Sequence, residues 1–221
     1  LKSTAYDRTN LSLSGQATVT PYLKFDGSMQ YTKTDNDKVL RGTDGPLYRA
    51  MLWPIVDDMS IYYAPDGSHM KKPDYYVDED LLNPLFAMNK NKFYDKSDRF
   101  LSNVSMNFTP IENAFLRAQV GWDVGMQTFE TSTHPYYANK NAGEGQFNLV
   151  QSNFSDPTIN ILAGYNDKFL QDKLSFSGQV GYHQLENRVT RSATYGTKFL
   201  VPDFQSINNT DPLSQTSSQR N

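Results

Sequence analysis

The sequence predicts an all-β fold, namely an antiparallel transmembrane β-barrel to which this chain contributes a partial set of about six strands with long extracellular loops. Three observations lead to this prediction. Six segments of about 10 residues alternate apolar and polar side chains. Short turns join these segments in pairs, and long polar connections join the pairs. The composition, 38% hydrophobic and 20% charged over 221 residues, is that of a folded protein.

The predicted strands form three pairs. The first spans about residues 9–32, with apolar residues at every second position and a turn at 20–22 (TPY), where the missing N–H of proline costs nothing. The second spans about 99–126, with alternation from Phe100 to Phe108 and from Leu116 to Val124 around a predicted turn at Thr109-Pro110. The third spans about 158–186 and contains a polar connector at 167–173.

Three long connections are predicted as extracellular loops, at about residues 34–97, 127–157 and 187–221. Loops longer than about 12 to 15 residues are uncommon in compact soluble domains. Outer-membrane barrels have short turns on the periplasmic side and long loops outside. The loop lengths therefore favour the assignment of residues 1–221 to part of one barrel domain. Within the first loop we predict a short helix near Asp78 to Met88, whose length Pro84 limits.

The apolar face of these strands needs a dry medium, and two media fit the alternation. In a barrel the medium is lipid. In the alternative, a soluble β-sandwich binding or adhesion module, it is a second sheet about 10 Å away. No run of about 20 apolar residues predicts a helical span. Because a barrel in lipid must close, with about 8 strands or more, these strands would belong to a longer protein, to a barrel of several chains, or to a soluble domain.

Four segments, taken in order, resemble one family. They are Asn83-Pro84-Leu85, then Asp98-Arg99-Phe100 followed by Asn103 and Ser105, then LRAQVGWD at 116–123, and FLVPDFQSIN at 199–208. In this order they resemble the middle of SusC/RagA-type TonB-linked outer-membrane transporters. The resemblance implies a barrel of about 22 strands with a plugged lumen, in the bacterial outer membrane.

The resemblance also implies a function. It implies part of a TonB-dependent nutrient importer that takes up oligosaccharides or peptides. Its partners would be a SusD-like surface lipoprotein as a lid, outer-membrane lipid, the glycan or peptide cargo, and the TonB complex through a missing N-terminal part. We expect neither a plug nor a TonB box in this chain, so the resemblance covers about a quarter of such a barrel by strand count.

Candidate ligand-binding residues lie in the first predicted loop. They are mostly aromatic and suit stacking on sugar rings or apolar side chains: Trp53, Tyr62, Tyr63, Asp66, Tyr75 and Tyr76. Packing of the loops on each other or on a lid protein is the interpretation that we favour, because aromatic residues serve interfaces as well as ligands. On the strands, the polar residues Arg117, Gln119 and Asp123 are predicted to face the lumen and contact the plug rather than cargo.

Other aromatic residues lie within the predicted strands. We expect them to form interfacial girdles at the level of the lipid head groups, with Trp122 near the outer leaflet. They are Tyr22, Tyr31, Phe100, Phe108, Trp122, Tyr165 and Tyr182.

Several function classes find no support in the sequence. A net charge of −3 without basic clusters argues against nucleic-acid binding. Cysteine is absent, and no nucleophile elbow, P-loop or zinc-binding motif occurs, so we predict neither an enzyme nor a cofactor. The acidic runs at 57–58 (DD) and 78–80 (DED) match no calcium loop and are interpreted as solvated charges. The three histidines, at 69, 134 and 183, are too scattered to predict a metal site.

Overall fold

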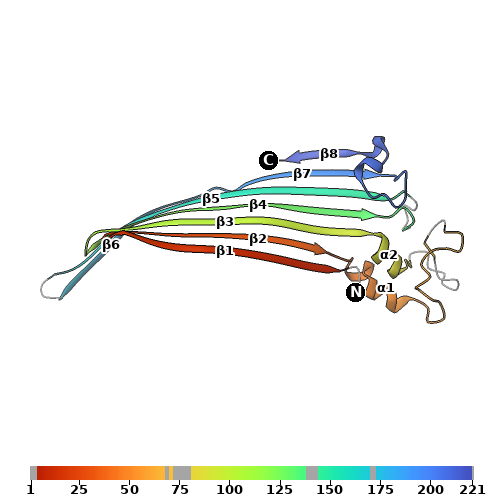
Figure 1. Ribbon diagram of the computed structural model, residues 1–221, viewed down its shortest axis with the longest axis horizontal. Helices are drawn as coiled ribbons and strands as arrows, with labels where there is room; N and C mark the ends of the chain where they lie inside the picture. Colours follow the sequence, from red (N-terminus) through yellow and green to blue (C-terminus); the bar gives the residue numbers. More distant parts are fainter. Residues whose placement is uncertain (1–3, 68–69, 72–80, 138–143, 170–172, 221) are drawn as a thin grey trace.

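The computed structural model describes residues 4–67, 70–71, 81–137, 144–169 and 173–220. They form one open antiparallel sheet of eight strands with loops gathered at one end (Figure 1). The strands are β1 (Ala5–Thr20), β2 (Leu23–Asp37), β3 (Lys92–Ile111), β4 (Ala114–Thr133), β5 (Gln146–Phe169), β6 (Leu174–Leu185), β7 (Arg188–Thr197) and β8 (Thr216–Arg220). The predicted antiparallel β fold is confirmed at this level, but the strands number eight rather than about six.

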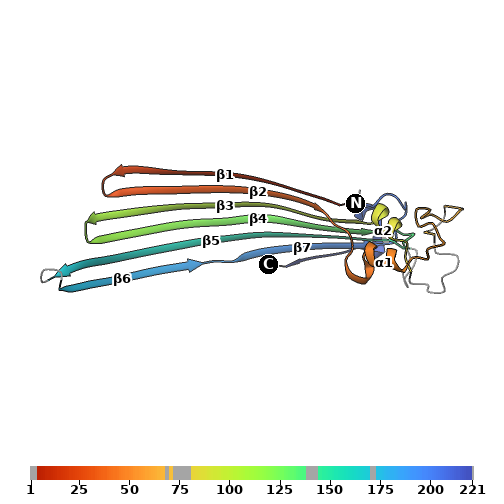
Figure 2. The same cartoon turned by 90° about the horizontal axis from the view of Figure 1, so that it is seen from below.

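Strands follow one another across the sheet in chain order. The exception is β5, whose second half pairs with β6 and whose first half pairs with β7. In Figure 2, β6 and β7 therefore lie in line, as two halves of one strand interrupted at residues 186–187. Pro157 of β5 faces the interruption, where its missing N–H breaks no ladder bond, and its carbonyl accepts from the Glu186 N–H (3.1 Å).

The turn predicted at Thr109-Pro110 is wrong. Strand β3 continues to Ile111, and the chain reverses at residues 112–113. The register shifts between Phe108 and Ile111, so Pro110 lies in a bulge rather than in the turn. The Thr109 N–H donates to the Tyr22 carbonyl of the neighbouring hairpin (2.8 Å). The sequence does not distinguish a proline in a bulge from a proline in a turn, because both positions tolerate the missing backbone N–H of proline.

Two of the predicted loops contain long strand segments. Within 127–157, β4 continues to Thr133 and β5 begins at Gln146; within 187–221 lie β7 and β8. The loop predicted at 34–97 is shorter as well, because β2 extends to Asp37 and β3 begins at Lys92. These strand extensions lack a regular apolar face, so alternation does not reveal them, although Thr and Val favour extended backbone.

Two helices of seven residues each, α1 (Pro46–Leu52) and α2 (Pro84–Lys90), lie between β2 and β3. The helix predicted near Asp78 to Met88 overlaps α2, which begins at Pro84, where a proline suits the first helical position; residues 78–80 lie outside the described ranges. The Asn83 side chain caps it by accepting from the N–H groups of Leu85 (2.9 Å) and Phe86 (3.0 Å). No helix in the described ranges is long and apolar enough to cross a membrane.

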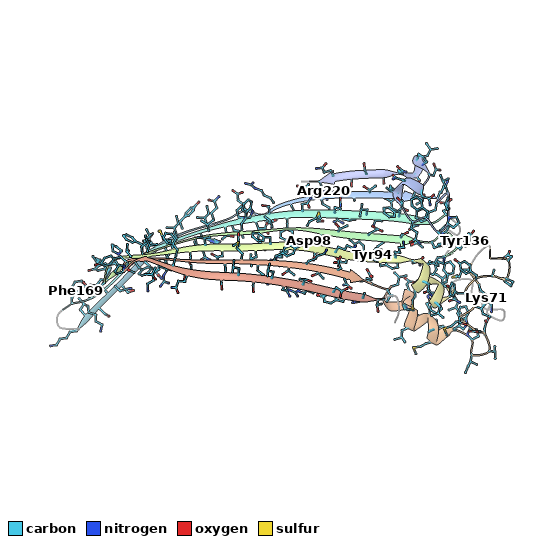
Figure 3. The ribbon with its side chains drawn as sticks, viewed as in Figure 1. Lys71, Tyr94, Asp98, Tyr136, Phe169 and Arg220 are labelled. Carbon is cyan, nitrogen blue, oxygen red and sulfur yellow. The ribbon has the colours of Figure 1, made fainter. Side chains whose placement is uncertain are left out.

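The hydrophobic core cluster of the described residues lies in the loops. Met70, Leu82 and Phe86 form it, with exposed fractions of 1%, 4% and 0%. Four tyrosines pack against this cluster: Tyr62, Tyr63, Tyr136 and Tyr137. Side chains of the strands instead project from both sides of the sheet (Figure 3), where Phe169 marks the end with the short turns and Tyr136 the end with the loops.

Candidate functional site

The register divides the sheet into an apolar face and a polar face. One cross-strand row of the apolar face contains Leu11, Tyr31, Phe100 and Val124. Towards the turns, another row contains Leu23, Phe108 and Leu116. Between these rows lies what we call the apolar band, whose alternate side chains come from Leu11–Val19, Leu23–Tyr31, Phe100–Phe108 and Leu116–Val124 and continue on β5 and β6. Each stretch has nine residues, close to the 9 to 11 with which a tilted strand crosses hydrocarbon.

Side chains of the apolar band are exposed. Leu11 is 68% exposed, Val104 and Val120 are each 56% exposed, and Val180 is 73% exposed. The described residues form a single sheet, so no second sheet covers these side chains as a sandwich would require. An apolar surface that spans six strands is far larger than the patches that monomeric soluble proteins leave in water. Its chemistry fits lipid.

Aromatic side chains lie towards the edges of the apolar band. Tyr31, Phe100 and Trp122 lie at the loop end, whereas Phe25, Phe108, Tyr165 and Tyr182 lie at the turn end. The middle row has none and contains Gly15, Gly27, Val104, Val120, Ile159 and Gln184. Gln184, its polar member, accepts a hydrogen bond from the Tyr182 hydroxyl (2.7 Å). This distribution is typical of interfacial girdles.

Three of these aromatic residues direct their polar atoms away from the middle of the band. The Tyr31 hydroxyl donates to the Asp98 carboxylate, in the next row towards the loops. The Trp122 indole N–H donates to the Ser155 hydroxyl (2.9 Å), also towards the loops. At the turn end, the Tyr165 hydroxyl donates to Asp167 (2.7 Å). Such amphipathic rings are suited to a boundary between an apolar and an aqueous medium.

The opposite face is polar along the same strand segments. Arg117, Gln119 and Asp123 lie on it together, since they alternate with Ala118, Val120 and Trp122 of the apolar face. A groove of about 610 Å³ runs along this face and is lined by Ser14, Gln16, Asp26, Ser28, Asn103, Ser105, Asn107, Arg117 and Gln119. A second groove of about 360 Å³ continues towards the loops and includes Asp123, Asp156 and Asn160.

Polar contacts on this face join neighbouring strands. The Arg99 Nε donates to Asp123 Oδ1 (2.8 Å), and Arg99 Nη2 donates to the other carboxylate oxygen. Asp26 Oδ2 accepts from the Asn107 amide (3.1 Å). Asp26 alternates with the apolar residues of its strand, so the sequence pattern assigns it to this surface, whereas Arg99 was predicted only as part of the family resemblance. The parity of Arg99 relative to Asn103 is the signal that assigns it to the same surface.

The candidate ligand residues of the first loop are placed differently from one another. Trp53 is 6% exposed, and its indole N–H donates to the Asp57 carbonyl (3.1 Å). Tyr62 and Tyr63 lie together, with ring centroids 5.3 Å apart, and both pack edge-on against Phe86. Asp66 lies in an exposed turn, and Tyr75 and Tyr76 lie outside the described residues. A ligand-binding role for these residues stays a prediction.

A charged cluster joins two loops distant in sequence. Asp203 Oδ1 lies 2.8 Å from Lys90 Nζ and 3.4 Å from His134 Nε2. The Lys90 ammonium lowers the pKa of the Asp203 carboxyl below its usual range, and Asp203 in turn raises the pKa of Lys90. The His134 imidazole is fully buried beside Phe86, and this burial lowers its pKa although Asp203 opposes the shift.

Of the two acidic runs, at 57–58 and 78–80, the described residues include only Asp57 and Asp58. Asp57 pairs with Lys71 (2.6 Å), and Asp58 accepts from the Ser60 N–H (2.8 Å). Within the described ranges, no three His, Asp or Glu side chains gather as metal ligands. Residues 78–80 and His69 lie outside those ranges.

Comparison with known proteins shows a likeness only at the level of structure. No family model matches the chain, and no curated protein sequence matches it. The structure of the RagAB peptide transporter superposes on 98% of this chain and on 25% of its own chain, with a TM-score of 0.72 and 12% identity. The sheet has the fold of part of the RagA barrel.

Two further RagAB structures agree. The RagAB peptide importer in its closed-closed state gives a TM-score of 0.70 at 16% identity, over 98% of this chain and 25% of that chain. The open-open state gives 0.70 at 12% identity, over 98% and 24%. The predicted likeness to RagA-type transporters is therefore confirmed for the fold. The chain spans about a quarter of the length of the RagAB chains that it matches.

Proposed function

We propose that this chain is part of the barrel wall of a TonB-dependent nutrient importer in the bacterial outer membrane. The observation that carries the proposal is the apolar band, nine residues long on each of four neighbouring strands, exposed, edged by aromatic rings and backed by a polar face. Lipid would cover the apolar face, and the polar face would face the lumen. The structural likeness to the RagAB transporter supports this orientation.

A closed barrel follows from the physics of the bilayer. Strand β1 pairs only with β2 among the described strands, and β6 pairs only with β5. Backbone groups on a free edge have no water to bond in hydrocarbon, so further strands must pair with these two edges. The resemblance to SusC/RagA-type transporters implies about 22 strands in all. Trp122 and the other band-edge aromatics would lie at head-group level.

The polar face would then surround a plugged lumen. Arg117, Gln119 and Asp123 would contact the plug, because they line the grooves of this face within the height of the apolar band. The loops beyond β2, β4 and β7 would form the external vestibule and meet a SusD-like surface lipoprotein acting as a lid. TonB would supply energy through a part of the protein that precedes this wall.

We propose peptides as the cargo, because the matching structures are those of a peptide transporter. Oligosaccharides are the other cargo class implied by the sequence resemblance. In the first loop, Trp53, Tyr62, Tyr63, Asp66, Tyr75 and Tyr76 would contribute to the vestibule. The chain would act by enclosing and binding cargo, without catalysis.

Single-cysteine labelling tests the orientation of the two faces. The chain has no cysteine, so Val104→Cys and Val120→Cys report on the apolar face, and Asn103→Cys and Gln119→Cys are matched neighbours on the polar face. Nitroxide labels on the protein in lipid vesicles are then exposed to oxygen, which is concentrated in hydrocarbon, and to a water-soluble nickel complex. We expect labels at Val104 and Val120 to respond to oxygen and the other two to be less accessible to it.

The alternatives give different patterns. A soluble β-sandwich would bury the labels at Val104 and Val120 from both reagents and leave those at Asn103 and Gln119 open to the nickel complex. Access of the nickel complex to Val104 and Val120 would also reject a lipid-facing band.

A further inference from the structure

Beyond the apolar band, apolar side chains change faces. On β4, the apolar face holds even-numbered residues as far as Val124, but Phe129 lies on the polar face. Its cross-strand partners are Asp95 of β3 and Val150 of β5, and Val150 pairs in turn with Ala193 of β7. Phe154 and Val189 are partners four residues nearer the band, and Tyr195 pairs with Asn148 two residues further from it. We call Phe129, Val150, Phe154, Val189, Ala193 and Tyr195 the loop-end patch.

Part of the loop-end patch is open to contact. Phe129 is 36% exposed, Val189 is 45% exposed and Tyr195 is 37% exposed. On the opposite face, at the same height, the strands carry charged residues such as Lys33, Asp35 and Lys96. The hydrocarbon of a bilayer therefore ends below this level, and lipid does not explain exposed apolar groups on the inner face.

Arg191 lies within the loop-end patch. It is exposed, and its cross-strand partners are Ser152 of β5, between Val150 and Phe154, and Arg220 of β8. In the described part of the chain no carboxylate forms an ion pair with Arg191, whereas Arg99, on the same face, is held by Asp123 and lies 5.9 Å from the Phe154 ring. A guanidinium with no carboxylate partner among the described residues, flanked by apolar side chains on β5 and β7 and by Arg220 on β8, complements a ligand with a carboxylate next to an apolar group.

We propose that the loop-end patch binds a peptide through a carboxylate on Arg191 and a neighbouring apolar side chain on Phe129, Phe154 and Val189. The inference rests on the proposed function, because it takes the polar face as the inside of a barrel. It deepens that function by naming a subsite and a substrate class, namely peptides with an acidic residue or a free C-terminus next to an apolar residue. Position supports a cargo contact, since the patch lies under the loops and outside the height of the band.

The test uses the full natural protein in detergent and two fluorescent probe peptides. One is dansyl-Gly-Phe-Glu with free carboxylates, and the other is dansyl-Gly-Phe-Gln-amide, which has the same shape without charge. We expect Arg191→Gln to weaken binding of the acidic peptide about tenfold or more and to leave the neutral peptide unchanged, since hydrogen bonds to charged groups are the strong ones. Phe129→Ser should weaken both peptides.

Arg188→Gln is the matched control. Arg188 lies three residues away but on the opposite face, paired with Glu186, so its removal should change neither affinity. Equal binding of the acidic peptide to the Arg191→Gln and unmodified proteins, or no binding by the unmodified protein, would overturn the inference and favour an internal segment of the protein as occupant of the patch. Retained heat-dependent gel mobility verifies the fold of each variant. Cysteine labels that still report a lipid-facing band would show that the subsite has failed and not the proposed function.

Discussion

The ring of Phe154 lies against the backbone of Gly125, its partner across β4 and β5. A Cβ on Gly125 would lie 2.5 Å from a Phe154 ring carbon and 2.8 Å from the Asp98 carbonyl oxygen. The same relationship recurs nearer the turns, where a Cβ on Gly164 would lie 2.4 Å from the ring of Phe115. Glycine thus leaves room for two aromatic rings of the polar face against the neighbouring strand.

Gly125→Ala should destabilise the protein by about 1 to 3 kcal/mol, the usual cost of forcing extra atoms into a packed site. Gly15→Ala is the matched control, because nothing lies within 4 Å of a Cβ there, and it should be neutral or slightly stabilising. The measurement is the urea midpoint of folding into detergent micelles. Equal urea midpoints for the two variants would show that a Cβ added to Gly125 fits beside the Phe154 ring without strain.

Val120→Arg should impair membrane folding far more than Gln119→Arg, one residue away. Val120 lies in the middle row of the apolar band, where an arginine facing lipid costs about 2 to 4 kcal/mol. Gln119 lies on the polar face, so the same side chain stays hydrated there. The comparison is made by folding into lipid vesicles, with heat-dependent gel mobility as the readout. If Gln119→Arg were the more damaging change, the assignment of the two faces would be reversed.

Arg99 and Asp123 should show coupled energies in a double-mutant cycle. Their side chains are 56% and 20% exposed, so screening limits the coupling to about 0.2 to 1 kcal/mol. Arg99→Gln, Asp123→Asn and the double variant are compared by urea unfolding. The control cycle pairs Arg117→Gln with Asp123→Asn, and these changes should add, because no contact joins the two residues in the described structure. Strict additivity for Arg99 with Asp123 would contradict the ion pair.

Asp203→Asn should loosen the loops. Asp203 is the common partner of Lys90 and His134, so its neutralisation leaves Lys90 without its ion pair. Hydrogen exchange of residues 84–91 and 199–205 is expected to speed up severalfold, since local opening needs less free energy. Glu144→Gln is the control, because the Glu144 pair with Lys198 is exposed and 3.8 Å long, and it should have little effect. Unchanged exchange in Asp203→Asn would show that other contacts hold the loops.

Alternation in the sequence was informative only over the height of the apolar band. There, apolar residues at every second position over nine residues, from Leu23 to Tyr31 or from Leu116 to Val124, identify both the strand and its two faces. Above it, the apolar residues of β4 change from even to odd positions between Val124 and Phe129, because the apolar band and the loop-end patch lie on opposite faces of the sheet. A reversal of phase looks like a loss of pattern, so these strand extensions were predicted as loops.

Contacts between residues far apart in the chain could not be predicted from the sequence. Arg117, Gln119 and Asp123 could be assigned to the polar face by counting along one strand. The partner of Asp123, however, is Arg99, 24 residues away, and its identification needs the register of β3 on β4. Lys90 and Asp203 are 113 residues apart and meet only because β4, β5 and β7 bring their loops to one end of the sheet.

The loops that meet at Lys90, His134 and Asp203 should open as the pH falls, because His134 is buried and uncharged. The His134 Nδ1 accepts from the Tyr136 N–H (3.1 Å), so the proton of the neutral ring is on Nε2, which faces Asp203. Burial lowers the pKa of His134 below its ordinary value of about 6.5, which the opened loop would restore. Below about pH 6.5 the opened state therefore takes up a proton first, so the stability of the closed loop is complete above that pH and declines below it.

Hydrogen exchange of residues 84–91 and 134–137 at pH 7.5 and pH 5.5, corrected for intrinsic rates, measures this effect. The unmodified protein should lose protection at pH 5.5. His134→Asn keeps an acceptor for the Tyr136 N–H but has no titrating ring, so its protection, although lower, should not depend on pH over this range. An equal loss of protection in both proteins would assign the pH dependence to another group.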